Sequence, residues 1–461
     1  MGGISISNIG SGLQIDQIIE ATINAESTPA TNALNRREAN AQATLSGLGS
    51  LKAALSKFND AVVKLTDINT FNKVKATSSD SKYLGSSAGT TATAGTYNID
   101  VNQLARGSRL ESGIGVFTSS TDLVGQGQLS FAVGSTNFTV DVVSTDTLAD
   151  LRNKINTAGA SAGVNANIVN TGTDVRLVLT SKTTGDNKTL TVTNNDASLD
   201  NVSTALTTAQ TAQSAKITVD GIEVTSETNT FTNAVSDLTF VAIKETEVGK
   251  PVTVTVGNDK DSVTTQVKAL VDSFNELIKT VSDLGKTKAV EGSNGTQFET
   301  GLLSGDALVR RVDAQLRSIL GGKYDTGGTL TNLQELGIKT KRDGTLELDT
   351  GKLSAALDNN YADVGKLFTD EKGISKSLGN ALNTYISSTG VISNRQLSLQ
   401  NQIKGITDER TRLAYRISQL ETRLRKQYTA LDGLVAGLNN TGTFLSQQLS
   451  KLPGFSSGSK S

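Results

Sequence analysis

The sequence contains no cysteine and no histidine. Their absence excludes disulfides, cysteine nucleophiles, the usual zinc sites and the imidazole base of most serine hydrolases. Tryptophan is also absent, and only three of the 461 residues are proline, whereas proline usually makes up about 5% of a chain. Few X-Pro bonds and no thiols suit a protein that crosses a narrow channel unfolded and then folds quickly, because prolyl isomerisation is slow. The alternative explanation is that the amino-acid composition of a cytosolic protein has drifted to few prolines and no cysteine without a functional reason.

A strong net charge and long apolar runs are missing as well. Lysine plus arginine number 44, and aspartate plus glutamate number 45, so the formal charge is −1. This balance gives no bulk electrostatic reason to bind nucleic acid or an anionic membrane. No apolar run approaches the ~18 residues of a transmembrane helix, and the first residues lack the blocks of a cleaved secretory signal. We therefore expect no nucleic-acid partner and no membrane insertion. The length favours about three domains.

Both ends of the sequence carry helical hydrophobic repeats. Residues 14–26 predict a short helix that ends at Ser27, and Thr28 with Pro29 predict the start of a second helix. Farther along, apolar residues recur at alternating steps of three and four, the heptad period of a coiled coil. The same period returns near the other end and includes Arg410 at a position where a polar residue usually fixes register. The predicted seam residues are Leu48, Leu51, Leu55, Phe58, Val62 and Leu65 in the first repeat, and Ile403, Ile406, Leu413, Ile417, Leu420, Leu424, Tyr428 and Leu431 in the second.

We expect the two repeats to pack against each other. The interpretation pairs the seam from Leu48 to Val62 with the seam from Ile406 to Leu424, which joins the two ends of the chain into one coiled-coil leg. Two ordinary core-facing helices are the alternative. Residues before about 40 and after about 440 are expected to be mobile in the free protein, because their apolar faces have no intramolecular partner long enough to bury them.

The middle of the sequence has a different period. From about residue 90 to 257, apolar residues alternate with period two, which is typical of half-buried strands. Asp220-Gly221 separates two of these runs and predicts a two-residue hairpin turn. Asp146-Thr147 leads into a short amphipathic helix. Helical periodicity returns at Asp261, and Asp343-Gly344 predicts one further hairpin.

The order of these segments predicts an α+β multidomain protein, with helical, coiled-coil terminal legs and a helical body into which antiparallel β-rich domains are inserted. Two segments at the ends are expected to be mobile, and the domains between them are expected to be discontinuous. The predicted boundaries are 1–40 for the N-terminal mobile leg segment, 41–89 plus 258–440 for the helical body and coiled coil, 90–112 plus 215–257 for one β-rich domain, 113–214 for a second inserted β-rich domain, and 441–461 for the C-terminal mobile tail.

No motif in the sequence carries recognisable catalytic chemistry. Residues 85–89 match the G-x-S-x-G pattern of a nucleophile elbow, but the chain has no histidine to activate Ser87, which we expect in a loop. Gly285-Lys286-Thr287 lacks the earlier glycine of a P-loop and reads as a helix end. Asn258, Asp259 and Asp261 lack the spacing of a calcium loop. We therefore predict that the protein is not an enzyme and needs no cofactor or metal.

Basic residues outnumber acidic ones between residues 410 and 426. Such a surplus is most simply the solvated flank of a coiled coil, and the alternative is a surface that meets an acidic partner.

Five segments, in order, resemble the bacterial flagellar filament cap family of hook-associated proteins. They are residues 10–27, 48–58, 95–112, 330–357 and 423–439, the last of these followed by residues 444–449. Two departures are mild: Gln14 stands where the family usually has aspartate, and Tyr428 where phenylalanine is common. Residues 129–158 also resemble an insert of flagellins, although the region around 113–214 varies within the family.

The resemblance implies a secreted homo-oligomer, commonly a pentamer, at the distal tip of the bacterial flagellum. There it would prevent loss of exported flagellin monomers and promote their folding and polymerisation, which filament elongation and motility require. It also implies export by the flagellar type III apparatus, contacts with flagellin and hook-filament junction proteins, and a cytosolic export chaperone that binds the C-terminal region.

Two other classes of function remain open on the sequence alone. A surface adhesin would use the β-rich domains to bind host mucin or glycan. A hydrolase would need a carboxylate pair or a Ser-Lys site.

Overall fold

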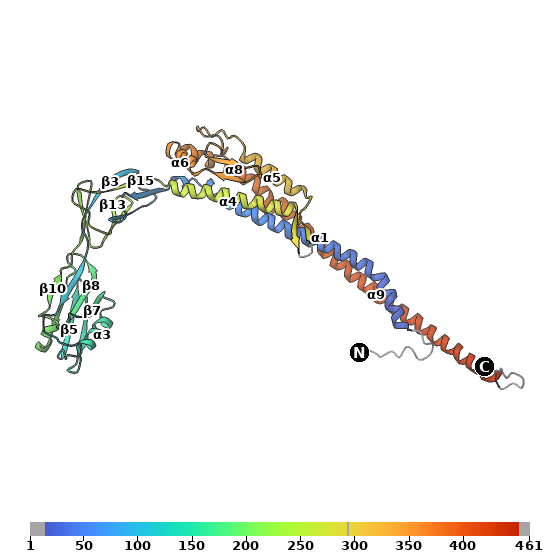
Figure 1. Cartoon of the computed structure of the whole chain (residues 1–461), viewed down its shortest axis with the longest axis horizontal. Coiled ribbons are helices and arrows are strands. Elements are labelled where there is room, and N and C mark those ends of the chain that lie inside the picture. Colours follow the sequence, from blue (N-terminus) through green and yellow to red (C-terminus); the bar gives the residue numbers. More distant parts are fainter. Residues whose placement is uncertain (1–13, 293–294, 451–461) are drawn as a thin grey trace. The chain divides into compact units, whose positions relative to one another are not determined.

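The computed structural model describes residues 14–292 and 295–450. The chain divides into two compact units, one formed by Met1–Asp67 with Thr264–Ser461 and the other by Ile68–Val263 (Figure 1). The first unit is mainly helical and the second mainly β-stranded. The β-rich unit is therefore an insertion in the helical unit, as the sequence predicts.

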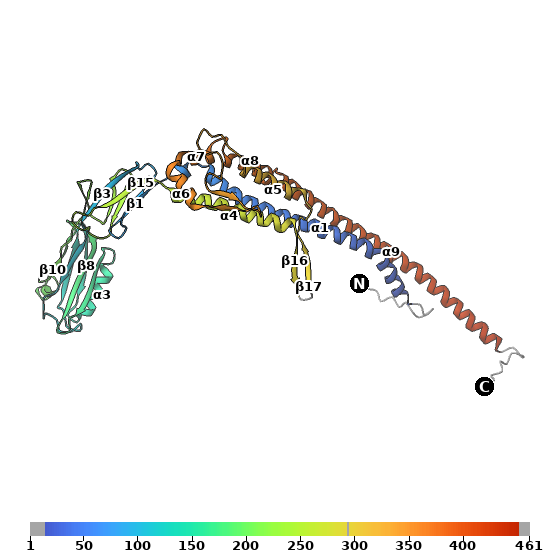
Figure 2. The same cartoon turned by 45° about the horizontal axis from the view of Figure 1, so that its top comes forward.

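Two long helices frame the helical unit. Figure 2 shows α1 (Ile15–Thr66) lying beside α9 (Val391–Leu449). Antiparallel hairpins are formed by β16 (Thr287–Gly292) with β17 (Gly295–Thr300), and by β18 (Ile338–Thr340) with β19 (Leu346–Leu348). The second hairpin confirms the turn predicted at Asp343-Gly344. The other helices are α4 (Lys260–Gly285), α5 (Ala307–Leu320), α6 (Thr350–Asn359), α7 (Tyr361–Thr369) and α8 (Ile374–Ile386).

The helix α1 corrects one expectation. It runs without a break through Pro29, where the sequence predicts the end of one helix and the start of another. Proline removes one backbone donor and crowds the preceding turn, at a cost of about 3 kcal/mol in a helix interior. The apolar contacts of a 52-residue helix on both sides of this position outweigh that local cost.

The β-rich unit has two apolar cores. One core lies between a five-stranded sheet, in the order β1-β15-β3-β11-β12, and a three-stranded sheet, β13-β14-β2. All neighbouring strands in both sheets are antiparallel. The strands are β1 (Val74–Ser78), β2 (Leu84–Ala88), β3 (Gly95–Gln103), β11 (Ala215–Val219), β12 (Ile222–Ser226), β13 (Thr230–Val235), β14 (Leu238–Ala242) and β15 (Val252–Asn258).

The second core lies between a four-stranded sheet, β10-β4-β8-β7, a three-stranded sheet, β6-β5-β9, and the helix α3 (Leu148–Ala158). These sheets are also antiparallel. The short helices α2 (Asn69–Asn72) and η1 (Ala197–Val202) complete the unit. The strands are β4 (Gly107–Glu111), β5 (Gly127–Val133), β6 (Thr136–Val142), β7 (Val164–Asn170), β8 (Val175–Thr184), β9 (Leu190–Asn194) and β10 (Thr207–Gln210).

Two local predictions in the β-rich unit are confirmed, the hairpin turn at Asp220-Gly221 and the start of a helix after Asp146-Thr147. Val219 pairs with Ile222, and the two residues between them have positive φ, 47° at Asp220 and 87° at Gly221. Two positive φ angles define the type I′ turn that matches the twist of a hairpin. Thr147 caps α3 through a reciprocal capping box with Asp150.

One predicted boundary differs from the structure. The segment 74–88 was expected in the helical body, but it forms β1 and β2, which pair with β15 and β14. These two strands are short and polar on one face, so their period of two is weak in the sequence. The other boundaries and the mobility of the ends stay predictions, and residues 1–13 and 451–461 lie outside the described part of the chain. No helix within that part is long and apolar enough to span a bilayer.

Candidate functional site

The first candidate surface is the pairing of α1 with α9. The two helices are antiparallel, and side chains along both of them set their register. Arg37 donates two hydrogen bonds to the Glu409 carboxylate, at 2.7 and 3.3 Å. Arg410 lies 2.6 Å from the Glu38 carboxylate, and near the start of α1 Asp16 lies 2.7 Å from Arg425. Residues 16–38 of α1 therefore lie opposite residues 409–425 of α9.

This register shows that the predicted pairing of the two seams is wrong. The segment from Ile406 to Leu424 faces the first half of α1 and not the seam from Leu48 to Val62. At the other end of the overlap, Lys52 donates a 2.8 Å hydrogen bond to Ser393. Both seams share the same period, and a period alone does not determine which turn of one helix meets which turn of the other.

The first seam is buried in the helical body. The rings of Phe58 and Phe274 lie 5.5 Å apart, which joins α1 to α4, and Lys57 pairs with Glu276 on the same two helices at 2.5 Å. A side chain added at Gly47 would meet Leu303, so α1 also packs closely against the loop before α5. All six predicted residues of this seam, Leu48, Leu51, Leu55, Phe58, Val62 and Leu65, have no exposed side-chain surface.

The second seam is less covered. Ile406 is buried, whereas Leu431 is 43% exposed. α1 contacts this part of α9 as far as the pair of Asp16 with Arg425, and most of the seam keeps some exposed surface. The half-buried members are Ile403, Leu413, Ile417, Leu420, Leu424 and Tyr428.

The basic surplus of α9 finds its acidic complement on α1. Arg410 also donates a 2.5 Å hydrogen bond to Asn35, so the predicted polar seam residue does bridge the two helices. The hydrogen bonds from Arg37 lower the pKa of Glu409, and burial opposes that shift only in part. Hydrogen bonds to Asp16 and then Glu421 raise the pKa of Arg425. Sequence reasoning missed these contacts, although the acidic start of α1 was the available signal.

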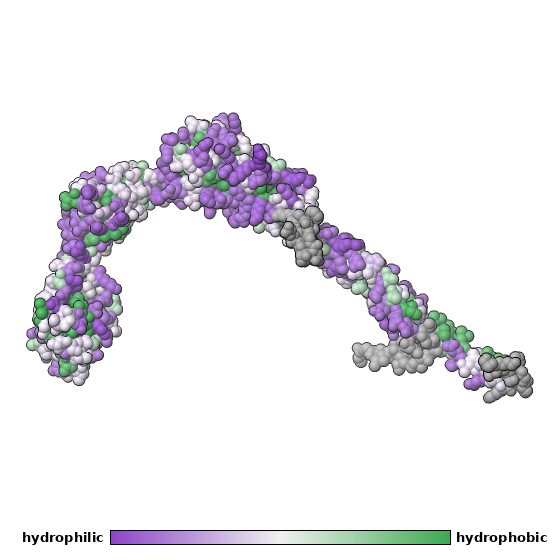
Figure 3. All heavy atoms as spheres, viewed as in Figure 1, coloured by the Kyte–Doolittle hydropathy of each residue, from purple (hydrophilic) through white to green (hydrophobic). Residues whose placement is uncertain are grey.

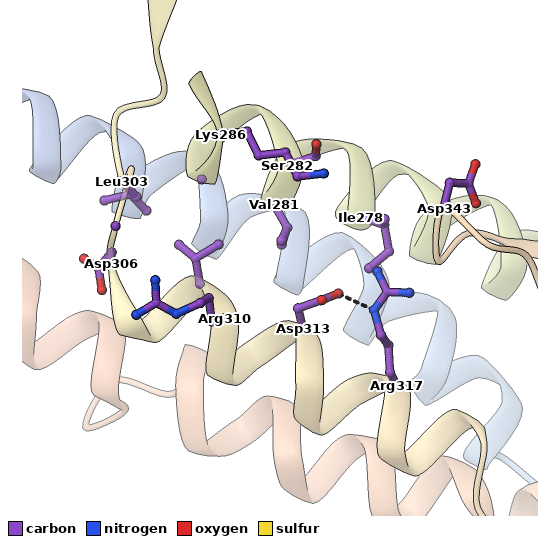
Figure 4. Close-up of a pocket in the computed structure, with 13 residues that line it drawn as sticks. Ile278, Val281, Ser282, Lys286, Leu303, Asp306, Arg310, Asp313, Arg317 and Asp343 are labelled. Atoms are coloured by element: carbon purple, nitrogen blue, oxygen red, sulfur yellow. Dashed lines mark hydrogen bonds and ion pairs between the residues drawn. The ribbon is translucent and has the colours of Figure 1, made fainter. Parts of the chain in front are cut away.

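A second candidate is a pocket of about 300 Å³ between α4 and α5. Figure 4 shows Ile278 and Val281 pointing from α4 toward α5, and Arg310, Asp313 and Arg317 arranged along α5. The Arg317 guanidinium donates a 2.7 Å hydrogen bond to Asp313 one helical turn away. The pocket is therefore lined by both apolar and charged side chains.

The carboxylates of this pocket are engaged in structural contacts. Burial on its own would raise the pKa of Asp306, but hydrogen bonds from Arg395 and from the Leu308 backbone N–H outweigh it and hold the pKa below its ordinary value. Asp306 thereby caps α5 and ties it to α9. Within the described ranges, no three histidine, cysteine or acidic side chains are grouped so that they could hold a metal ion.

The other sequence motifs have structural roles. Ser87 lies in β2 opposite Thr239 of β14, in a strand and not in the predicted loop. Gly285 ends α4, as predicted for the Gly-Lys-Thr segment. Asp261 lies 2.6 Å from the Lys75 ammonium group, and that contact raises the lysine pKa. None of these arrangements resembles a nucleophile elbow, a P-loop or a calcium loop.

The fold and its surfaces define an assembly protein, with long terminal helices and an inserted β-rich unit. The family description "Flagellar hook-associated protein 2 N-terminus" matches residues 11–108, and "Flagellar hook-associated protein 2 C-terminus" matches residues 212–440. "Flagellin hook IN motif" matches residues 128–183, in agreement with the resemblance of 129–158 to a flagellin insert.

Full-length relatives and a solved structure agree with these matches. The flagellar hook-associated protein 2 of Aeromonas caviae is 33% identical over 96% of this chain and 97% of its own length. The A-type flagellar hook-associated protein 2 of Pseudomonas aeruginosa is 32% identical over 98% of both chains. The crystal structure of the D1-D2-D3 domains of the flagellar cap protein FliD from Escherichia coli, 29% identical, covers 77% of this chain and 99% of its own with a TM-score of 0.52. This chain belongs to the flagellar hook-associated protein 2 family.

Proposed function

We propose that the protein is the structural cap at the distal end of the bacterial flagellar filament, where it retains exported flagellin monomers and promotes their folding and polymerisation. The observation that carries this proposal is the match to cap proteins along nearly the whole chain, from the first turn of α1 to the last third of α9. The relatives and the solved structure described above give no support to the adhesin alternative.

The finer features of the proposal rest on the chemistry of the chain. We propose a homo-oligomer, with the pentamer common in the family as its simplest form, that contacts flagellin and the hook-filament junction proteins. The scarcity of proline and the absence of cysteine support unfolded export by the flagellar type III apparatus. A cytosolic export chaperone would bind the C-terminal region. The antiparallel α1 and α9 would form the coiled-coil leg of each subunit.

The proposed cap acts without catalysis and without a cofactor. In the α4–α5 pocket Asp313 pairs with Arg317 and Asp306 pairs with Arg395, and the chain lacks histidine and cysteine. Binding and release of flagellin would therefore depend on surface complementarity alone.

The test is complementation of a cap-deleted strain. The wild-type chain should restore filament length and swarming and should lower the amount of monomeric flagellin in the medium. The matched control is Leu51→Asp, which places a charge at a fully buried position of the helical body and should prevent rescue. Secretion of wild-type protein with no gain in filament length over the empty vector would contradict the proposed function.

A further inference from the structure

The two apolar cores of the β-rich unit are joined by two short segments, residues 104–106 and 211–214. The first segment connects β3 to β4, and the second connects β10 to β11. Hydrophilic residues gather on the surface where the two lobes of this unit meet (Figure 3). Domains joined by a polar junction normally move relative to each other, because only a large apolar interface holds them firmly. The rigidity of this junction therefore depends on individual hydrogen bonds.

The two connecting segments pair with each other. Arg106 and Gln213 form an antiparallel bridge, in which the backbone N–H of each residue donates to the carbonyl oxygen of the other, at 3.0 and 2.9 Å. The Gln213 side chain donates a further hydrogen bond of 2.8 Å to the Leu104 carbonyl oxygen. The junction is thus a two-stranded ribbon. A ribbon only two strands wide can bend across its flat face, so on its own it would act as a hinge.

A third contact joins the cores beside this ribbon. The turn between β8 and β9 belongs to the second core, and it lies against the turn between β12 and β13 of the first core. Thr184 donates a 2.5 Å hydrogen bond to the Glu227 carbonyl oxygen, and the Lys188 ammonium group lies 3.6 Å from the Glu227 carboxylate. A Cβ added at Gly185, where φ is 119°, would lie 3.2 Å from the Glu227 Cβ. The two turns are therefore in close contact.

The same turn of the second core is also tied to one of the connecting segments. The Asp186 carboxylate accepts a 2.8 Å hydrogen bond from the Ser214 backbone N–H, and the Asp186 backbone N–H donates a 3.1 Å hydrogen bond to the Ser214 hydroxyl. On the side of the first core, Asn229 exchanges hydrogen bonds of 2.7 and 3.2 Å with the backbone of Ala105. Both connecting segments are therefore fixed by residues outside the ribbon.

The sheet order places the third contact to one side of the ribbon. β11 lies between β3 and β12, and Ala215 at the start of β11 pairs with Ser226 at the end of β12. Glu227, the next residue, is therefore one strand away from β11, on the side that faces away from β3. A ribbon together with an attachment beside it resists bending, whereas the ribbon alone does not.

We propose that residues 184–188 form a brace that holds the two β cores together as one rigid body. With the brace, the surfaces of the two cores keep a fixed spacing, which a partner that contacts both cores requires. Without it, the ribbon becomes a hinge and the second core moves relative to the first. Neither the brace nor its test depends on the proposed function, because both concern one purified chain.

Two spin labels report on the junction, because the chain has no cysteine of its own. Ile114→Cys and Ile222→Cys place the labels on side chains that are 81% and 71% exposed. Ile114 follows β4 and Ile222 follows β11, and both strands lead away from the junction. Bending at the ribbon therefore changes the distance between the two labels, which double electron–electron resonance measures on the purified full chain.

The test variant adds Thr184→Ala and Asp186→Ala to the labelled chain, which removes both side-chain hydrogen bonds of the brace. The matched control adds Asn187→Ala and Thr189→Ala, which change two exposed side chains of the same turn. The distance distribution should be about twofold wider, or more, in the test variant than in the control, and the control should match the labelled chain without these changes.

Equal widths in the test and control variants would overturn the proposal. Asp186→Ala alone leaves Thr184 in place and should give an intermediate width, so the expected order of widths is control, single variant, double variant. A single variant as narrow as the control, beside a double variant that is no wider, would refute the brace as well. Circular dichroism of each variant verifies that the strands and helices are still folded.

Discussion

The register of α1 against α9 makes a quantitative prediction about two substitutions. Leu55 has no exposed surface and packs in the helical body, whereas Ile417 is half-buried on the leg. From the contact of Glu38 with Arg410, Leu55 lies 17 residues farther along α1 and Ile417 lies seven residues farther along α9, in the opposite direction. At 1.5 Å per residue the two side chains are about 36 Å apart.

The separation predicts independent effects on stability. Leu55→Ala should lower the free energy of unfolding by about 2–5 kcal/mol, since it leaves a cavity in a closed core. Ile417→Ala should cost only about 1–2 kcal/mol, because part of its side chain is already in water. The double variant should equal the sum of the two single variants to within about 0.5 kcal/mol.

Urea unfolding followed by far-UV circular dichroism measures these values, because nearly all of the helix lies in the helical unit. The positive control is Phe58→Leu with Phe274→Leu, whose rings are 5.5 Å apart and should couple by about 0.5–1.5 kcal/mol. A comparable coupling between Leu55 and Ile417 would show that the two seams are in contact after all, and the register derived from the ion pairs would be refuted.

Three further outcomes follow from local geometry. The pKa of Glu409 is lowered in the folded state, so its ion pair with Arg37 stabilises the leg fully above the unfolded carboxyl pKa of about 4.3, and this stabilisation is lost as the pH falls through the folded pKa. In Arg37→Ala the pKa of Glu409 measured by NMR titration should rise toward its unfolded value. An unchanged pKa would contradict the pairing. Thr147→Ala should destabilise the β-rich unit by about 0.5–2 kcal/mol in the same denaturant assay, because α3 loses its cap. Thr157→Ala removes an exposed hydroxyl that donates a hydrogen bond within the same helix, and it should change the free energy of unfolding by no more than about 0.5 kcal/mol. Equal effects of the two substitutions would argue against the cap. Gly221→Ala should cost about 1–2 kcal/mol because φ is 87° there, and a neutral result in thermal unfolding would show that the turn relaxes.

Much of the local structure was predictable because its causes are local. The positive φ angles at Asp220 and Gly221, the cap at Thr147 and the helix end at Gly285 each follow from a few adjacent residues. The strands β1 and β2 were missed because their exposed faces are as polar as a loop. The break expected at Pro29 was wrong because distant packing outweighs one lost hydrogen bond.

The features of the candidate surfaces likewise fall into those that follow from the sequence and those that depend on tertiary packing. The sequence by itself determined the heptad periods of both ends, the insertion of a β-rich unit between them and the absence of histidine and cysteine chemistry, because period and composition are properties of the chain. Only the tertiary structure decided that Leu48–Leu65 is enclosed by the helical body, that Asp16 and Glu38 meet arginines of α9, and that the last turns of α9 extend beyond their partner. These pairings join residues hundreds of positions apart in the sequence. Many helix registers satisfy the same heptad period, so the packing of the whole unit determines which register forms.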